Sequence, residues 1–178
     1  MQMFVLDDIP DNAARALADC HTRVIGREVT MCLSAWYAKN MGHKDELPYK
    51  EFNHPIVEQF IDPRTRLWAM HYATAIFVDF KNRFGKAHAS EEKLDQLRRY
   101  CVLYDLAVHK IGLHQMWHAR FTYVGIDDMP IPGRTIIRDL SLDEAVDLYR
   151  QYYKVKLATI KVPVTYTKRK KPEWLEES

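Results

Sequence analysis

Hydrophobic and polar positions in this chain repeat mainly with the period of an α-helix. Residues 62–85 give the clearest pattern: Asp62 precedes Pro63, as a capping acid precedes proline at the first helical position, and Gly85 follows the last apolar residue. Between these boundaries a large apolar side chain recurs every four residues, at Trp68, Tyr72, Ile76 and Phe80. The pattern predicts a helix from Pro63 to the residue before Gly85, with one buried face.

A long first helix is predicted after a short extended arm at residues 1–10. Asp11 or Asn12 has the side chain of an N-cap, and the polar stretch after Asn40 ends the helix. Seven positions separate His21 from Glu28, so a continuous helix would place the two side chains almost one above the other. The same stripe contains Leu17, Val24 and Met31.

Two more helices are predicted in the second half of the chain. Ser90 is the expected N-cap of one, whose apolar stripe is Leu94, Leu97, Cys101 and Tyr104. Ser141 and Glu144 form a capping box for the last helix, which Pro163 prevents from continuing.

The other segments complete the predicted fold. A shorter helix is expected around residues 111–120, and residues 127–134 are expected to be a loop because they contain two prolines and a glycine. The fold class that follows is mostly α: a single compact helical domain over residues 1–178, with the extended arm at one end and an extended basic tail at 161–178.

Composition restricts where such a protein works. The chain has 178 residues with 47% hydrophobic and 28% charged residues, which is typical of one globular domain, and no apolar run is long enough to cross a membrane. The three cysteines form no CxxC pair, which favours a reducing cytosol over a disulfide framework or a zinc cluster. The first residues do not resemble a secretory signal, and Gln2 favours retention of Met1.

Charge is unevenly distributed along the chain. Residues 150–172 contain eight basic side chains and no acidic one. This segment could bind phosphates, and the aromatic residues among its basic ones could stack on exposed bases. The alternative is that Tyr149, Tyr152 and Tyr153 pack the last helix and the lysines are simply solvated.

The pairing of His21 with Glu28 also has two interpretations. One is an ordinary amphipathic helix with an Asp19–Arg23 surface pair and a buried, hydrogen-bonded histidine. The other is a pocket opening on this face, because a glutamate on an apolar stripe needs a partner or a wet cleft.

The motif around these residues resembles the pyrimidine-dimer DNA glycosylases of the phage endonuclease V type. Their first long helix carries the same residues at the same spacing, here Leu17, Ala18, Asp19, His21, Arg27 and Glu28. The resemblance implies that Glu28 is the catalytic carboxylate and that His21 and Arg27 contact the damaged strand. It also implies that the α-amino group of the chain, here that of Met1, is the nucleophile.

A looser resemblance, to uncharacterised phage and bacterial proteins placed in the same superfamily, covers most of the chain. The shared segments, in order, are the FVLD arm, Asn53-His54-Pro55, residues 83–88, residues 145–153 and residues 171–174. The resemblance adds His54 as a residue of the cleft. The other candidate DNA-binding residues are Arg23 and, from the basic and aromatic composition of the tail, Lys168, Arg169, Lys170, Lys171 and Trp174. Two departures from the dimer glycosylases concern the amine: it belongs to the bulky Met1, and the arm before Asp19 is five residues longer.

The function expected from the resemblance is a DNA glycosylase, with or without abasic-site lyase activity, in the cytoplasm of a bacterial or phage-infected cell. Its substrate would be duplex DNA carrying a dimer, another lesion or a modified pyrimidine, and the mechanism needs no cofactor. His114 and His118 have the spacing of a metal pair but no third ligand, so no metal is expected. The alternatives are a non-catalytic DNA or modified-base binding protein, and a phage accessory protein that captures a nucleotide or a host protein.

Overall fold

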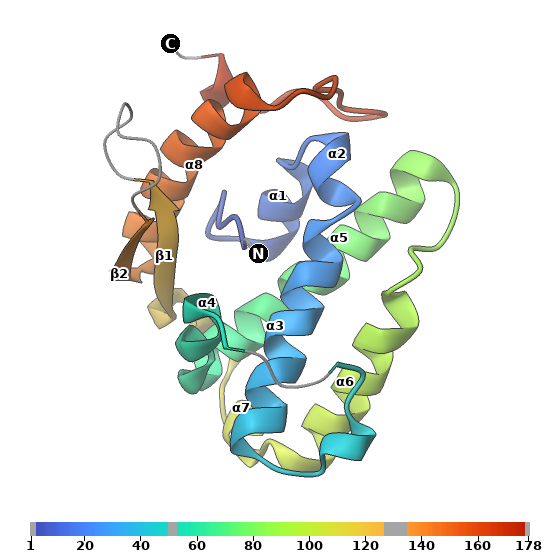
Figure 1. Ribbon diagram of the computed structural model, residues 1–178, viewed down its shortest axis with the longest axis vertical. Helices are drawn as coiled ribbons and strands as arrows, with labels where there is room; N and C mark the ends of the chain where they lie inside the picture. The colour runs from blue at the N-terminus through green and yellow to red at the C-terminus, as the bar shows by residue number, and fades with distance from the viewer. Residues whose placement is uncertain (1–2, 50–52, 127–134, 177–178) are drawn as a thin grey trace.

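Two long helices, α3 (Ile25–Asn40) and α5 (Pro63–Phe84), pack against each other at the centre of the fold (Figure 1). The computed structural model describes residues 3–49, 53–126 and 135–176. These residues form a compact, mostly α-helical domain, which confirms the predicted fold class. The remaining elements are α1 (Pro10–Arg15), α2 (Asp19–Thr22), η1 (Lys44–Glu46), α4 (Pro55–Glu58), η2 (Gln59–Ile61), α6 (Glu91–Tyr104), α7 (Leu106–His109), η3 (Leu113–His118), β1 (Arg120–Ile126), β2 (Thr135–Ser141), α8 (Leu142–Thr159) and η4 (Glu173–Leu175).

Helix α5 has the boundaries that its sequence predicts. The Asp62 carboxylate accepts a hydrogen bond from the Arg64 amide at 2.9 Å, and Gly85 ends the helix in the left-handed region at φ 70°. Its predicted stripe is buried, with Trp68, Tyr72 and Ile76 each 0% exposed. The capping box of α8 is also confirmed, because Ser141 and Glu144 exchange side-chain and backbone hydrogen bonds.

The predicted first helix is wrong in its continuity, because the chain breaks it into α1, α2 and α3. In a continuous helix the Arg15 carbonyl would accept from the Asp19 amide. Here the Arg83 guanidinium donates hydrogen bonds to the carbonyls of Arg15 and Leu17, and the Asp19 amide donates to the Thr165 carbonyl instead. The start is also earlier than predicted, since Ile9 is the N-cap and Pro10 the first helical residue.

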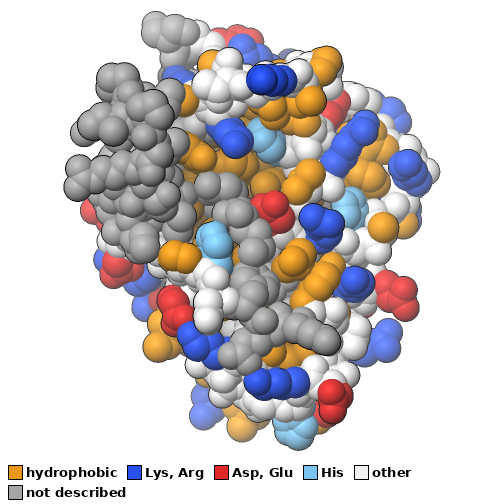
Figure 2. Space-filling model, viewed as in Figure 1, with side chains coloured by type: hydrophobic (Ala, Val, Ile, Leu, Met, Phe, Trp, Pro, Cys, Tyr) orange, Lys and Arg blue, Asp and Glu red, His pale blue; other side chains and the backbone are white. Residues whose placement is uncertain are grey.

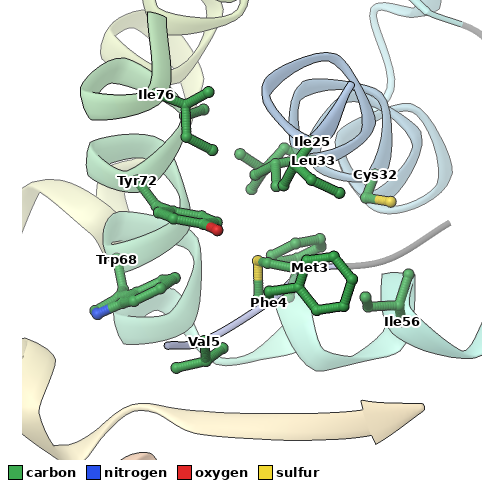
Figure 3. Packing of buried hydrophobic residues seen from close by; sticks show 14 of the residues in the cluster. Met3, Phe4, Val5, Ile25, Cys32, Leu33, Ile56, Trp68, Tyr72 and Ile76 are labelled. Carbon is green, nitrogen blue, oxygen red and sulfur yellow. The ribbon is translucent and has the colours of Figure 1, made fainter. Parts of the chain in front are cut away.

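The arm at the start of the described chain is part of the core. The side chains of Met3, Phe4, Val5 and Leu6 are at most 2% exposed. Figure 3 shows the arm enclosed by side chains from α3, α4 and α5. Burial of four successive apolar residues anchors this segment, with a gain of about 1.5–3 kcal/mol for each large side chain removed from water.

A two-stranded antiparallel hairpin, which the helical pattern did not predict, lies beside α8 (Figure 1). Strand β1 pairs with β2 so that Phe121 lies opposite Leu140, and both side chains are buried. The predicted loop at 127–134 connects these strands in sequence but lies outside the described residues. The expected helix around residues 111–120 is the 3-10 helix η3, on which His114 and His118 are both exposed.

The segment after α8 folds back over the domain. In Figure 1 it runs from the end of α8 across to α2 and the last turns of α5. The Thr165 carbonyl accepts from the Asp19 amide at 2.9 Å, and the Thr167 amide donates to the Asp19 carboxylate at 3.0 Å. The prediction of an extended tail holds only in part, since the backbone turns at Lys168 (φ 55°), forms η4 at Glu173–Leu175, and is docked on the domain by hydrogen bonds.

Among the described residues, no helix combines the length and the hydropathy that a membrane span needs.

Candidate functional site

Glu28 is half-buried in the first turn of α3. Burial and, to a smaller extent, the charge of Glu28 one turn away raise the pKa of the Cys32 thiol to about 12. The pKa of His54 is lowered by burial, and the same Glu28 charge opposes this decrease. Glu28 therefore acts electrostatically on side chains from both α3 and the start of α4, in a partly enclosed region.

His54 precedes α4 and is its N-cap. Its Nδ1 accepts a hydrogen bond from the Ile56 amide at 3.3 Å, so the neutral ring carries its proton on Nε2. The half-buried ring remains partly accessible beside the Glu28 region. The packing of α4 on α3 thus places His54 within electrostatic range of Glu28, although the sequence predicted the two residues separately.

The predicted nucleophile, Met1, lies outside the described residues. The arm is described from Met3 onwards, and Met3 belongs to the same buried cluster as Cys32 and Ile56 (Figure 3). The described arm therefore leads to the part of α3 that carries Glu28.

His21 has the environment of the structural alternative, a buried and satisfied histidine. It is 8% exposed, and its Nδ1 lies 2.8 Å from the Tyr153 hydroxyl, which also accepts from the Ala18 amide. The His21 ring and the Tyr153 hydroxyl therefore share a buried hydrogen bond. Burial and, to a smaller extent, the charge of Lys156 together lower the pKa of His21 to about 4, so the ring is neutral near pH 7. Its expected role as a strand contact does not agree with this burial.

Asp19 has a different partner from the predicted one. Its carboxylate binds the buried guanidinium of Arg83 at 3.0 Å and accepts from the hydroxyls of Thr165 and Thr167 at 2.8 and 2.7 Å. Burial alone would raise the pKa of Asp19, but these hydrogen bonds together lower it. Asp19 therefore organises the core, and the predicted Asp19–Arg23 surface pair is wrong.

Arg23 and Arg27 are exposed, as DNA contacts must be. Both line a hollow of about 600 Å³ on the surface between α3 and the segment before α6. Figure 2 shows lysine and arginine side chains gathered over this side of the molecule. Of the residues predicted on the first helix, these two and Glu28 remain accessible for binding.

The basic tail is only partly available. Arg169 binds the Asp79 carboxylate at 2.7 Å, and half-buried Trp174 packs 6.3 Å from Tyr153 with the Arg150 guanidinium 5.3 Å from its ring. Lys168 donates to the Asn82 carbonyl at 3.3 Å but is exposed. Lys170 and Lys171 are also exposed, so three of the five predicted tail contacts face solvent.

The environment of the three tyrosines of α8 agrees with a role in packing and not with stacking on bases. Tyr149 and Tyr153 are 1% and 0% exposed, and both rings contact Phe4 of the arm edge to face. Tyr152 is half-buried against the same ring. Their aromatic surface is therefore already covered by the arm.

Arg83 and Asp79 form a buried ion pair on α5 that was not predicted from the sequence. Arg83 donates to Asp79 at 2.6 Å, and both are buried. Their spacing of four residues on one helix is the signal from which an ion pair could have been predicted. Nothing local in the sequence indicates that Asp19 and Arg169 complete the network.

The described residues thus define a helical domain with a half-buried carboxylate beside a basic surface. They contain no group of three or more histidine, cysteine, aspartate or glutamate side chains that could hold a metal ion. No family model, curated protein or solved structure matches the chain, so the resemblance of the Asp19–Glu28 motif to the glycosylases stays a prediction.

Proposed function

We propose that this protein is a DNA glycosylase with abasic-site lyase chemistry, acting on a damaged or modified pyrimidine. The observation that carries the proposal is the position of Glu28, which is half-buried on α3, lies within electrostatic range of Cys32 and His54, and is adjacent in sequence to the exposed Arg27. A carboxylate in a partly enclosed site can transfer protons and stabilise positive charge on a sugar. The neighbouring Arg27 supplies a positive charge that can bind a phosphate.

The arm supports the choice of the Met1 amine as nucleophile. Cys32 follows Glu28 by four residues, a rise of about 6 Å along α3, and Met3 packs in the cluster that contains Cys32. Two residues precede Met3, and an extended chain of two residues spans up to about 7 Å. An arm of this length therefore allows its α-amino group to reach Glu28.

The chemistry needs an amine that is partly neutral near pH 7. An α-amino group has an ordinary pKa of about 7.7–8.0, against about 10.4 for lysine. Its nitrogen attacks C1′ as the bond from C1′ to the base breaks, and the base leaves with the proton that the site supplies. The nitrogen then loses a proton, and C1′=N forms as the C1′–O4′ bond breaks and O4′ takes up a proton, which leaves the opened sugar attached as a protonated Schiff base. Removal of a proton from C2′ expels the 3′ phosphate by β-elimination, and water releases the enzyme.

The test is borohydride trapping on duplexes that contain an abasic site, a thymine dimer or 5-hydroxymethyluracil. We expect a covalent protein–DNA adduct that disappears when the α-amine is acetylated and is strongly reduced in the Glu28→Gln variant. Glu92→Gln, which removes an exposed carboxylate from α6, is the matched control and should keep the adduct. Absence of an adduct with all three substrates would refute the proposal.

The alternative with structural support is a non-catalytic DNA-binding protein of the same fold. The exposed Arg23 and Arg27 favour it, because binding through them does not require Glu28. Tight, salt-sensitive binding that is unchanged by Glu28→Gln, without any adduct, would identify this alternative.

A further inference from the structure

A continuous basic groove crosses the surface between α2, α3, the segment after α5 and the start of α6. It consists of two hollows of about 550 and 600 Å³ that share Arg23, His88 and Ala89. Lys86 lines the first hollow, and Arg27 and Lys93 line the second. Among the residues that the structure describes, no aspartate or glutamate lines either hollow, and the described lining presents four permanent positive charges.

These charges are not neutralised within the described part of the chain. No described carboxylate lies within ion-pair distance of Arg23, Arg27, Lys86 or Lys93. The acids in the first turn of α6, Glu91 and Glu92, do not line either hollow. Like charges brought together repel one another, and an anion placed between them removes that repulsion.

Aromatic rings hold two of the four cations in place. The Arg23 guanidinium lies 4.8 Å from the centroid of the Phe84 ring, and the Lys93 ammonium lies 4.4 Å from that of Tyr49. Cation–π contacts restrict these long side chains before a ligand arrives. Less conformational entropy is then lost on binding, which favours affinity for an anion.

His88 fixes the two walls of the groove relative to each other. Its Nδ1 accepts from the Ser90 amide at 3.1 Å, so the proton of the neutral ring is on Nε2, which donates to the Arg23 carbonyl at 2.9 Å. The ring also stacks on Phe77 at a centroid distance of 4.9 Å. The backbone that carries Arg23 is thus tied to the segment between α5 and α6.

We propose that this basic groove binds the phosphodiester backbone of a nucleic acid strand, with Lys86 and Lys93 as phosphate contacts. A row of cations complements the regularly spaced phosphates of a nucleic acid strand better than it complements one small anion. Lys168 lengthens the row, because it is bound to Asn82 on the same end of α5 that carries Phe80 and Phe84 of the groove. The inference extends the proposed function, since a strand in the groove passes Arg27 beside Glu28, but binding itself requires no chemistry.

The experiment measures binding of fluorescein-labelled, undamaged duplex and single-stranded oligonucleotides by anisotropy over a range of salt concentrations. We expect Lys86→Gln/Lys93→Gln to bind at least about ten-fold more weakly at low salt, and the slope of log K against log salt to decrease by roughly 2. Arg99→Gln/Lys110→Gln removes two exposed charges outside the groove and should bind like the wild type. Thermal unfolding verifies that both double variants are folded.

Each result decides the matter. Equal losses in the two double variants, or no loss in Lys86→Gln/Lys93→Gln, would overturn the proposal. So would competition by polyglutamate as effective as that by unlabelled DNA, which would indicate an acidic protein as the partner. Groove-dependent DNA binding without a borohydride adduct would sustain the groove and reject the glycosylase, so the two proposals fail separately.

Discussion

The guanidinium of Arg83 donates to a carboxylate oxygen of Asp19 at 3.0 Å, across 64 residues of chain and between two side chains that are almost fully buried. The same guanidinium bonds Asp79 on its own helix and the carbonyls of Arg15 and Leu17. The Arg83 side chain thereby connects α5 to Arg15 at the end of α1 and to Asp19 at the start of α2, on the two sides of the break in the predicted first helix. Two buried carboxylates share this cation, and Arg169 gives Asp79 a second partner.

Replacing Arg83 with methionine should destabilise the fold by about 3–5 kcal/mol, because Asp19 and Asp79 lose their shared buried partner. Urea unfolding at pH 7 measures the change. Arg120→Met is the matched control: it breaks a pair with Asp139 whose side chains are 47% and 71% exposed, and should leave the free energy of unfolding nearly unchanged. A similar, small loss in both variants would contradict the importance of the buried network.

His21 should titrate with a pKa of about 4, far below the ordinary value of 6.5, because burial and then Lys156 disfavour its charged form. Below pH 6.5 the unfolded chain takes up this proton while the folded protein does not. Stability should therefore fall as the pH decreases from 6.5 to 4, by about 3 kcal/mol in total for this group. Assigned NMR signals of the His21 ring give the midpoint directly, and a midpoint near 6.5 would disprove the prediction.

Asp105 should contribute fully to stability above about pH 4 and progressively less at lower pH. Burial alone would raise its pKa, but hydrogen bonds from Arg66 and Tyr37 lower it below the ordinary 3.8. The contribution is complete above the pKa of the unfolded chain and is lost as the pH falls through the lower folded value. Asp105→Asn should reduce stability at pH 7 and weaken the pH dependence below 4. Urea unfolding between pH 2.5 and 7 tests both effects, and an unchanged slope in the variant would count against them.

Gly26→Ala should destabilise the protein by about 1–3 kcal/mol, because α3 and α5 approach closely at this residue. A Cβ at Gly26 would lie 2.6 Å from Cε1 of the Phe77 ring and 3.0 Å from Cγ2 of Ile76. Chemical unfolding measures the loss, with the exposed neighbour Arg27→Ala as control. If the alanine variant is as stable as the wild type, the two helices can separate at little cost.

Local patterns in the sequence predicted helices α5, α6 and α8 because their caps and apolar stripes are contained within each segment. The break after α1 could not be predicted in this way, since it depends on Arg83 and Thr165, far along the chain. The hairpin was missed for a different reason. The β-branched and aromatic residues of β1 do favour a strand, but only pairing with β2 and packing on α8 stabilise it.

The candidate site was predictable in part. Residue types and spacing identified Glu28, Arg23 and Arg27, which remain accessible, but not the burial of His21, because its partner Tyr153 is 132 residues away. The charges of the tail were visible in the sequence, whereas the docking of Arg169 on Asp79 was not. Lys86 and Lys93 enter the basic groove only through the packing of α6 beside α3.

The hydrogen bonds between Asp19 and Thr167 also govern the order of events during synthesis. These residues are 148 positions apart, so at about 5–20 residues per second a ribosome needs roughly 7–30 s to add the second after the first. Throughout that interval the nascent chain cannot bury Asp19 with all of its partners. Folding around α2 is therefore completed after translation has passed Thr167, and a prematurely terminated chain would expose this region to proteases.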